Sequence, residues 1–294
     1  MTKPQLPFKK ADIARAFSMA SCTYDKAAFI QKEVGERLLE KLSYSETPLK
    51  NILDVGAGTG LLTRQLQQKF PQSSLFGLDL AQGMMQWAKN TQRWHLWKRN
   101  PSYLCADMEK LPFLDDSFDL VFSNFTLQWS LSVQESFAEF KRVLKPNGIL
   151  LFSTLGPKTL YELRDSWFKA NSAPHVNTFM DMHDYGDLLL NTDFSRPVMD
   201  MEMITVTYTE VKHLLQDLKA TGARNINNNR TKGMTSKHCF QKMLQAYEAY
   251  KTDGVYPATY EILYGHAIKS QSTLYRAQED GTIKIPANKI PLLA

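Results

Sequence analysis

Cysteines are scarce in this sequence, and long apolar runs are absent. The 294 residues include three cysteines, Cys22, Cys105 and Cys239, and no Cys-x-x-Cys pair. This usage supports neither a disulfide framework nor a zinc site, so we expect no bound metal. No apolar run approaches the roughly 18 residues that a membrane span needs, and the first ten residues lack the apolar stretch of a secretory signal. We therefore expect a soluble, cytoplasmic protein without a membrane partner.

A strong excess of charge of one sign is also missing. The formal net charge is +5, with 22% charged and 43% hydrophobic residues, which is ordinary globular usage. This excess suits a negatively charged substrate or partner, but it is far below the charge density of a dedicated nucleic-acid binder. The segment Arg93 to Arg99 mixes cations and aromatic rings as a nucleic-acid surface does. An exposed helix end and loop is the plainer interpretation, and we expect no nucleic-acid partner.

After residue 50 the sequence alternates short apolar runs with helical segments. The segment before it, Ile13 to Leu42, has apolar residues at helical spacing and predicts two helices. The expected strands are Ile52 to Val55, Ser74 to Leu78, Tyr103 to Ala106, Leu120 to Ser123 and Ile149 to Ser153. The expected helices between them are Leu61 to Lys69, Gly83 to Lys89 and Val133 to Leu144, and Lys145 to Gly148 predicts a helix stop and turn. This alternation is typical of a parallel, doubly wound sheet.

Beyond Thr154 the alternation pauses. The expected elements there are helices at Thr159 to Lys169 and Tyr185 to Asn191, a strand at Met201 to Tyr208, helices at Glu210 to Ala220 and up to about Tyr250, and a strand at Thr259 to Ile268. The predicted fold class is α/β: a Rossmann-like, doubly wound, mostly parallel seven-stranded sheet with N-terminal helices and a helical cap inserted after the fifth strand. We predict one domain over residues 1–270, with the cap at about 155–195, and a loosely attached tail at 271–294.

Three glycines follow the first predicted strand directly. Gly56, Gly58 and Gly60 stand between a buried strand and a helix, where the backbone must turn tightly and let a ligand approach. The spacing is GxGxG. It differs from the GxGxxG of dinucleotide enzymes, and no Lys-Ser or Lys-Thr completes a phosphate-binding P-loop. The alternative is a tight strand-to-helix loop that binds nothing.

Polar residues also end the next strands. Asp79, 23 residues after Gly56, ends the second strand, where an acid can accept both hydroxyls of a ribose. The alternative is that Asp79 caps the following helix. Asp107 with Met108 closes the third strand and Asn124 the fourth, so one crevice at the strand ends can collect all of these side chains.

These residues resemble the class I methyltransferases. The resemblance implies that S-adenosylmethionine is the methyl donor, with S-adenosylhomocysteine as the product. It implies that the glycine turn lies under the methionine part, that Asp79 holds the ribose, that Asp107 and Met108 meet the adenine, and that Asn124 faces the methionine moiety. The cofactor-binding candidates are Asp54, Gly56, Ala57, Gly58, Gly60, Asp79, Leu80, Met84, Asp107, Met108 and Asn124. Asp54 has an equally plain alternative as an acid that braces the loop.

More specific stretches are similar to the malonyl-[acyl-carrier protein] methyltransferases of biotin synthesis. These stretches are Phe17 to Ala20 with Tyr24-Asp25, Asn124 to Trp129, Phe152 to Leu163 and Leu218 to Ala223, and the match spans about residues 8–270. Ala57-Gly58-Thr59 departs from the Cys-Gly-Pro of some members. The resemblance implies methylation of the free carboxylate of a malonyl thioester carried by an acyl-carrier protein.

The chemistry that this resemblance implies needs no general base. A carboxyl with a pKa near about 4 is already ionised at neutral pH, so the lack of a convincing histidine or glutamate base is consistent with it. The reaction joins a sulfonium to a carboxylate and neutralises both, so a dry pocket that aligns them is more useful than a highly charged one.

Candidates for the substrate side come from aromatic, polar and cationic residues. Phe17, Gln128 and Trp129 are candidates for the pocket wall, with core packing as the alternative. Tyr24, Arg230 and Lys219 are the catalytic candidates: Arg230 is favoured for holding the carboxylate, with a hydroxyl from Tyr24. The alternative for the two cations is a solvated surface charge, and Arg164 is a further candidate.

Three other functions compete with this interpretation. One is a methyltransferase-like assembly factor of a respiratory complex, and the mitochondrial targeting segment of those proteins is not visible here. Another is a binding protein that has kept the fold and lost the chemistry, against which the intact glycine turn and Asp79 argue. The third is a carboxyl methyltransferase of a small free acid, which differs in accepting free malonate as readily as its thioester.

Overall fold

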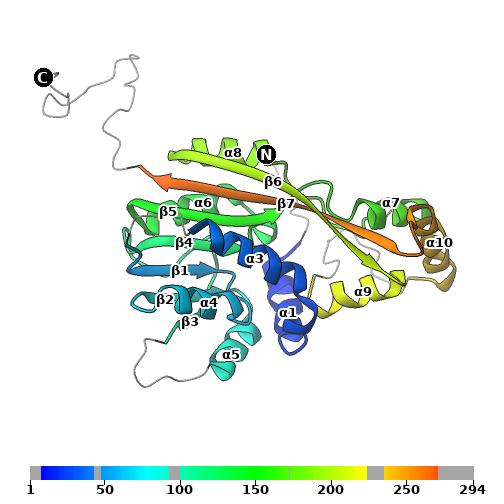
Figure 1. The fold of residues 1–294 in the computed structure, drawn as a ribbon, viewed down its shortest axis with the longest axis horizontal. Coiled ribbons are helices and arrows are strands. Elements are labelled where there is room, and N and C mark those ends of the chain that lie inside the picture. The colour runs from blue at the N-terminus through cyan, green and yellow to red at the C-terminus, as the bar shows by residue number, and fades with distance from the viewer. Residues whose placement is uncertain (1–7, 43–47, 93–99, 172, 224–234, 271–294) are drawn as a thin grey trace, which may run out of the picture.

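The core of the molecule is one seven-stranded sheet (Figure 1). The computed structural model describes residues 8–42, 48–92, 100–171, 173–223 and 235–270. Within them the strand order is β3-β2-β1-β4-β5-β7-β6. The strands are β1 (Asn51–Val55), β2 (Ser74–Asp79), β3 (Ser102–Cys105), β4 (Phe118–Asn124), β5 (Leu144–Leu155), β6 (Phe194–Tyr208) and β7 (Tyr256–Lys269). The first five are parallel to their neighbours, and β7 runs antiparallel to both β5 and β6, which confirms the predicted mostly parallel sheet.

Helices cover both faces of this sheet. They are α1 (Lys10–Ala20), α2 (Tyr24–Ala27), α3 (Phe29–Lys41), α4 (Leu61–Lys69), α5 (Gln82–Thr91), α6 (Val133–Val143), α7 (Tyr161–Ala170), α8 (Met182–Asn191), α9 (Val211–Ala220) and α10 (Lys237–Tyr247), with short 3-10 turns η2 (Leu127–Trp129) and η3 (Glu248–Tyr250). None of the described helices is long and apolar enough to cross a membrane.

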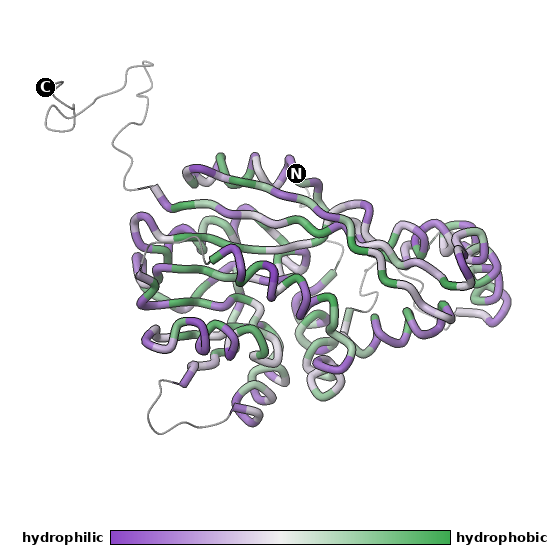
Figure 2. Tube along the Cα trace, in the orientation of Figure 1, coloured by the Kyte–Doolittle hydropathy of each residue, from purple (hydrophilic) through white to green (hydrophobic). Residues whose placement is uncertain are grey.

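Alternate residues of the central strands face different helices. Ile52 and Leu120 pack with α3 and α4, whereas Leu53 and Val121, one position further along each strand, pack with α6 and α8. This is the period-two pattern of a strand buried on both faces, and it explains why these runs are apolar without alternation. Figure 2 shows the same arrangement, with hydrophobic colour along the central strands and hydrophilic colour on the outer turns of the helices.

The order of the strands reverses next to β1, which lies between β2 and β4. In open α/β sheets a ligand crevice forms at such a switch point, outside the carboxyl ends of the strands. In Figure 1 the strands β1, β4 and β5 point toward the side where α1 and α9 lie. The N-terminal helices therefore stand over the edge at which the predicted site residues end their strands.

The structure corrects several predicted boundaries. The N-terminal region forms three helices rather than two, because the chain breaks at Ser21 and again at Ala28, which leaves α2 only four residues long. The predicted turn at Lys145 to Gly148 lies inside β5, where Leu144 pairs with Phe118 across a register shift and Asn147 has a left-handed φ of 63°. The last two strands begin earlier than predicted, at Phe194 and Tyr256, because the two pair with each other over thirteen positions.

The region predicted as a cap contains α7 and α8. Helix α7 packs against α10 and β7, and α8 packs against β6 and α6. The long β6 and β7 extend beyond β5 to the place where α7, α9 and α10 lie (Figure 1). The division into one domain, a cap and a tail stays a prediction, and residues 271–294 lie outside the described part of the chain.

Candidate active site

The glycine turn between β1 and α4 has left-handed backbone at all three of its glycines, and Gly56 and Gly58 differ in the space beside them. Gly56 has φ 77°, its N–H donates to Leu78 O at 2.7 Å, and a Cβ placed on it would lie 1.9 Å from Thr126 Oγ1. Gly58 has φ 55°, and a Cβ placed on it would have no atom within 4 Å. A side chain is therefore excluded at Gly56 by the protein itself, whereas the space beside Gly58 is open.

Asp79 ties this turn to the start of α5. Its carboxylate accepts a hydrogen bond from Gly58 N at 3.0 Å and another from Ala81 N at 2.8 Å. Burial raises the pKa of Asp79 to about 6, and the two backbone donors partly oppose that rise. Asp79 thus joins the glycine turn to the segment before α5 and lines a cavity at the strand ends, but it is not the N-cap of α5, which is Ala81.

That cavity, the strand-end cavity, has a volume of about 660 Å³. Its lining brings together eight of the eleven predicted cofactor residues: Gly56, Gly58, Asp79, Leu80, Met84, Asp107, Met108 and Asn124. The side chain of Asn124 is fixed, because Nδ2 donates to Gln31 O at 2.9 Å and Oδ1 accepts from Ser153 Oγ at 2.7 Å. The carboxyl ends of β1, β2 and β4 and the segment after β3 therefore meet at one crevice.

Asp54, Ala57 and Gly60 do not line the strand-end cavity. Asp54 is buried behind the turn, where it accepts a hydrogen bond from Thr63 Oγ1 at 2.6 Å and where burial raises its pKa to about 7. Asp54 and Ala57 face a smaller neighbouring cavity. Gly60 begins α4 beside Tyr103. For Asp54 the geometry agrees with the predicted alternative, an acid that braces the loop.

Helix α1 forms part of the same cavity wall, through the predicted wall residue Phe17 and through Lys10 and Ile13, which the sequence analysis did not nominate. Lys10, Ile13 and Phe17 all line the strand-end cavity. The Lys10 ammonium donates to Asp107 and to Glu109, so it joins α1 to the segment after β3. Ser18 Oγ accepts from Gly83 N at 3.1 Å, which fixes the other end of the helix to α5.

A second cavity, the outer cavity, adjoins the first and has a volume of about 970 Å³. Phe17, Tyr24, Phe125 and Trp129 line both cavities and form their shared wall. Among the described residues that line the outer cavity, Asp217 is the single carboxylate and there is no lysine or arginine. Polar groups enter it mainly from neutral side chains, including Tyr24, Gln31, Tyr208 and Tyr260.

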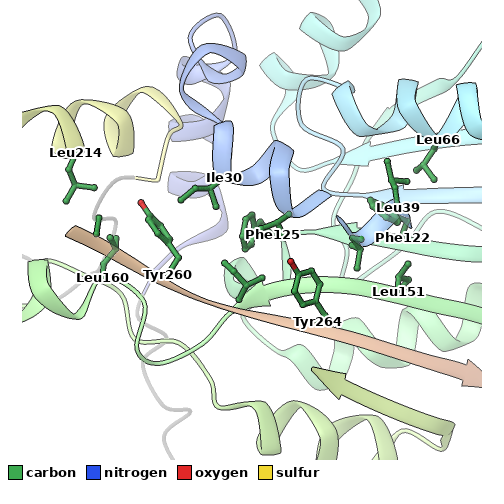
Figure 3. Close-up of a cluster of buried hydrophobic side chains, with 14 of the residues drawn as sticks. Ile30, Leu39, Leu66, Phe122, Phe125, Leu151, Leu160, Leu214, Tyr260 and Tyr264 are labelled. Carbon is green, nitrogen blue, oxygen red and sulfur yellow. The ribbon is translucent and has the colours of Figure 1, made fainter. Parts of the chain in front are cut away.

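The shared wall is rigid in its aromatic part. Trp129 makes edge-to-face contacts with Phe17 at 5.2 Å and with Phe8 at 6.2 Å between ring centroids. Phe125 has a left-handed φ of 51°, and its N–H donates to Ser153 O at 3.0 Å. Figure 3 shows Phe125 within the buried cluster that also contains Ile30 and Tyr260. Both cavities therefore meet at a packed, apolar surface at the end of β4.

Two predicted polar residues of this wall differ in their partners. Gln128 is satisfied within the protein, because Nε2 donates to Phe125 O at 2.7 Å and Oε1 accepts from Thr154 Oγ1 at 3.2 Å. Tyr24 has no hydrogen-bond partner for its hydroxyl among the described residues. Burial raises its pKa, and the nearby Asp79 and Asp25 raise it further, so the phenol stays protonated. Tyr24 is thus a free O–H donor where the two cavities join.

The predicted cations that the structure describes do not lie at this wall. Lys219 is exposed on α9 and does not line either cavity. Arg230 lies outside the described residues. Arg164 also lines neither cavity, and it donates to Pro157 O at 2.7 Å and to Thr159 O at 2.6 Å.

The outer cavity also contains residues that the sequence analysis did not nominate. Two of the distinctive stretches supply many of them: Leu155, Thr159, Leu160 and Leu163 from one, and Leu218, Thr221 and Ala223 from the other. Gly222, between the last two, has φ 77°, and a Cβ on it would lie 3.2 Å from Ala16 O. The family-like sequence of these stretches could have indicated that their residues line a cavity. No sequence pattern marks Tyr208, Tyr260 or Asp217 in that way.

Comparisons with known proteins agree with this geometry. Residues 53–152 match the family model described as "Methyltransferase domain". A relative from Gallionella capsiferriformans, named "Malonyl-[acyl-carrier protein] O-methyltransferase", is 44% identical over 89% of this chain and 91% of its own length. A relative of the same name from Laribacter hongkongensis is 40% identical over 92% of this chain and 93% of its own length.

This chain belongs to the malonyl-[acyl-carrier protein] O-methyltransferase family. It is an O-methyltransferase, and its methyl donor is S-adenosylmethionine. The described residues fit that cofactor: the space beside Gly58 is open, the Asp79 carboxylate faces the cavity, and the walls near Met84 and Met108 are apolar.

Solved structures show the fold alone. The YcgJ protein of Bacillus subtilis has a TM-score of 0.54 at 16% identity, covering 80% of this chain and 98% of that one. The [4+2]-cyclase SpnF has a TM-score of 0.52 at 18% identity, covering 82% of this chain and 81% of that one. Because a cyclase shares the fold, the architecture does not identify the methyl acceptor. The acceptor must be inferred from the residues of the site.

Proposed function

We propose that this enzyme methylates the free carboxylate of a malonyl thioester on acyl-carrier protein, an early step of biotin synthesis. The observation that carries the proposal is the meeting of the two cavities at the wall formed by Phe17, Tyr24, Phe125 and Trp129. A methyl donor in the strand-end cavity and a carboxylate in the outer cavity would come into direct contact at the junction that these residues border. The names of the curated relatives support malonyl-carrier protein as the acceptor.

The strand-end cavity holds the methyl donor in this proposal. When bound, S-adenosylmethionine supplies a methyl group that is attached to a positively charged sulfonium. Loss of the methyl group leaves this sulfur as a neutral thioether in S-adenosylhomocysteine. Asp79 would accept the ribose hydroxyls, and Asp107 with Met108 would contact the adenine. Gly58 leaves room for the methionine part, and Asn124, fixed by Gln31 and Ser153, presents the backbone beside it.

The outer cavity positions the acceptor. A carboxylate is ionised at neutral pH, so the described residues have no proton to remove and need only align an oxygen with the methyl group. The apolar rings of the shared wall exclude water from the meeting point. The free hydroxyl of Tyr24 donates to the carboxylate without neutralising it, which keeps the oxygen nucleophilic. Arg230 and Lys219 stay sequence-based candidates for an additional charge.

The alternative functions are less well supported. The curated relatives, which span most of this chain, carry the acyl-carrier protein name, and this favours the thioester over a respiratory-complex subunit. The apolar and hydroxyl-rich outer cavity suits an elongated, mostly neutral group carrying one carboxylate. Acyl-carrier protein is acidic, so the formal net charge of +5 favours its approach. A cytoplasmic location stays a prediction.

The test is direct methyl transfer. Purified enzyme with S-adenosylmethionine and malonyl-carrier protein should increase the mass of the carrier protein by one methylene, as measured by intact-protein mass spectrometry. Acetyl-carrier protein, which has no free carboxylate, is the matched control and should gain nothing. If malonyl-carrier protein gains no mass while another acceptor is methylated, the proposal is wrong.

A further inference from the structure

The polar groups of the outer cavity are unevenly placed. Tyr24 lies at the shared wall and Gln128 next to its Trp129, whereas Tyr208, Tyr260 and Asp217 come from β6, β7 and α9. Tyr208 ends β6, and Tyr260 pairs with Ile204 in the neighbouring strand, so both rings project from the same face of the β6–β7 ladder. Figure 3 shows Tyr260 rising from β7 between Leu160 and Ile30, with Leu214 of α9 nearby.

Asp217 stands next to this tyrosine pair as the lone carboxylate of an otherwise neutral wall. Burial raises the pKa of Tyr208, and the charge of the neighbouring Asp217 and a hydrogen bond from the Tyr208 hydroxyl to its carboxylate raise that pKa further. Asp217 has no ion-pair partner within 4.0 Å among the described residues, so no cation of the described wall compensates its charge. On α9 it precedes Thr221 by one helical turn, and both residues line the cavity.

A negative charge in this position discriminates between acceptors that otherwise look alike. A malonyl thioester has one carboxylate and a neutral thioester end, whereas free malonate has two carboxylates, both ionised at neutral pH. When one carboxylate of free malonate lies at the shared wall, the second must enter the cavity that contains Asp217. Like charges in a partly desolvated site repel strongly. Repulsion between the second carboxylate of malonate and Asp217 would therefore weaken the binding of free malonate without changing the binding of the malonyl thioester.

We propose that Asp217 is a specificity-determining residue that excludes free dicarboxylates from the outer cavity and so restricts methylation to malonyl thioesters. The inference rests on the proposed function, since it explains how the same site tells the thioester from the free acid. A neutral thioester arm meets no such repulsion.

The experiment compares acceptors in the wild type and in Asp217→Asn. The substitution removes the charge and keeps the shape of the side chain. We measure kcat/KM for malonyl-carrier protein and for free malonate, and the inhibition constant of malonate against malonyl-carrier protein. In Asp217→Asn the preference for the thioester should fall on the order of ten-fold, and malonate should inhibit at about ten-fold lower concentration.

Two variants separate lost charge from damaged structure. Tyr208→Phe removes a neighbour of Asp217 and keeps the charge, so the preference for the thioester should persist. Asp253→Asn removes an equal charge from an exposed turn outside both cavities, so it controls for the net charge of the protein. Calorimetric titration with S-adenosylmethionine confirms that each variant keeps a folded strand-end cavity.

The outcomes distinguish this inference from the function on which it rests. A wild type that fails to methylate malonyl-carrier protein, or that uses free malonate equally well, overturns the proposed function and the inference with it. A wild type that prefers the thioester, together with an Asp217→Asn variant whose preference and malonate inhibition are unchanged, overturns the inference alone. So does a Tyr208→Phe variant that loses the preference as fully as Asp217→Asn, because a general distortion of the wall would then explain both.

Discussion

The two cavities differ in how their walls are assembled. The strand-end cavity is lined by α1, by Tyr24 of α2 and by residues from Val55 to Trp129, many of them within a few positions of the end of a strand. The outer cavity collects its wall from α1, α2, α3, the segment after β4, the segment after β5, residues 175–179, β6, α9 and β7. In the proposed function the cofactor would therefore meet residues near strand ends, whereas the acceptor would meet a wall assembled by packing between distant segments.

The electrostatics of the two cavities differ as well. The strand-end cavity contains Asp79, Asp107 and the cation Lys10, each engaged in hydrogen bonds or an ion pair. The outer cavity has one carboxylate, Asp217, among otherwise neutral or histidine side chains in the described part of its wall. Substitutions in the first should therefore change cofactor affinity, and substitutions in the second should change the choice and the alignment of acceptor.

The largest expected effect is that of Asp79→Ala on cofactor binding. The substitution removes the acceptor of two charge-assisted hydrogen bonds to the ribose, each of about 1.5 to 3 kcal/mol. Affinity for S-adenosylmethionine should fall on the order of 100-fold or more, as measured by calorimetry. Because Asp79 also accepts from Ala81 N, circular dichroism must show a folded protein. Unchanged affinity in a folded variant would mean that Asp79 serves the protein backbone alone.

The next effect separates two glycines of the same turn. Gly56→Ala forces a Cβ toward Thr126 Oγ1 at a φ of 77°, and should lower the free energy of unfolding by roughly 2 to 4 kcal/mol. Gly58→Ala meets no atom within 4 Å, so only its left-handed backbone should lower the free energy of unfolding, by about 1 kcal/mol. Its methyl group would nevertheless take up space beside the strand-end cavity, which Gly58 lines. Denaturant titration should rank Gly56→Ala as the less stable variant, and Gly58→Ala should lose cofactor affinity while it stays folded. Equal stabilities would contradict the contact with Thr126.

The pKa of Asp79 predicts a pH dependence of cofactor affinity. Because that pKa is raised from 3.8 to about 6 without ligand, the acid is mostly protonated at pH 5 and loses its charge as an acceptor. Affinity should fall about ten-fold from pH 7 to pH 5. The same rise favours the folded state as the pH falls toward 4, so this group does not itself cause acid unfolding in that window. Asp79→Asn should flatten the calorimetric pH profile, and a profile of unchanged slope would assign the dependence to another group.

A smaller effect is expected for the hydroxyl at the shared wall. Tyr24→Phe removes an O–H donor that has no partner among the described residues, so folding should be unaffected. The KM for malonyl-carrier protein should rise about ten-fold, the value of one hydrogen bond to a charged group, while S-adenosylmethionine affinity changes little. Tyr161→Phe, at an exposed tyrosine outside both cavities, is the control. If only the affinity for S-adenosylmethionine fell, the Tyr24 hydroxyl would instead contact the cofactor in the strand-end cavity.

The smallest effect is that of Lys10→Met. This change removes the cation between Asp107 and Glu109, and the partly exposed pair is screened by salt. Cofactor affinity should fall about two- to five-fold at low ionic strength, and the difference from the wild type should shrink at high salt. Lys41→Met, which breaks an ion pair to Asp200 outside both cavities, should have no effect on cofactor affinity. A loss that salt does not change would indicate packing by the side chain instead.

The sequence predicted the sheet and much of the cofactor site because the determining interactions are local. The apolar run of β1, that of β4 and the glycines after β1 are each patterns of a few consecutive residues. Parallel strands end at one edge, so Asp79, Asp107 and Asn124 had to converge once the strands were assigned. Asp54 shows the limit of this argument, since its place behind the turn depends on a bond to Thr63 one turn into α4.

Tertiary structure decided the rest. Tyr208, Tyr260 and Asp217 have no distinguishing pattern along the chain, and the β6–β7 pairing and the position of α9 bring them to one wall. Lys10 reaches Asp107 across a separation of 97 residues, which no sequence spacing indicates. Lys219 has a suitable charge but is exposed on α9. The sequence did not determine whether this side chain faces the cavity or the solvent. The physical reason is that local geometry follows from neighbouring residues, whereas the lining of a cavity between packed elements follows from their relative placement.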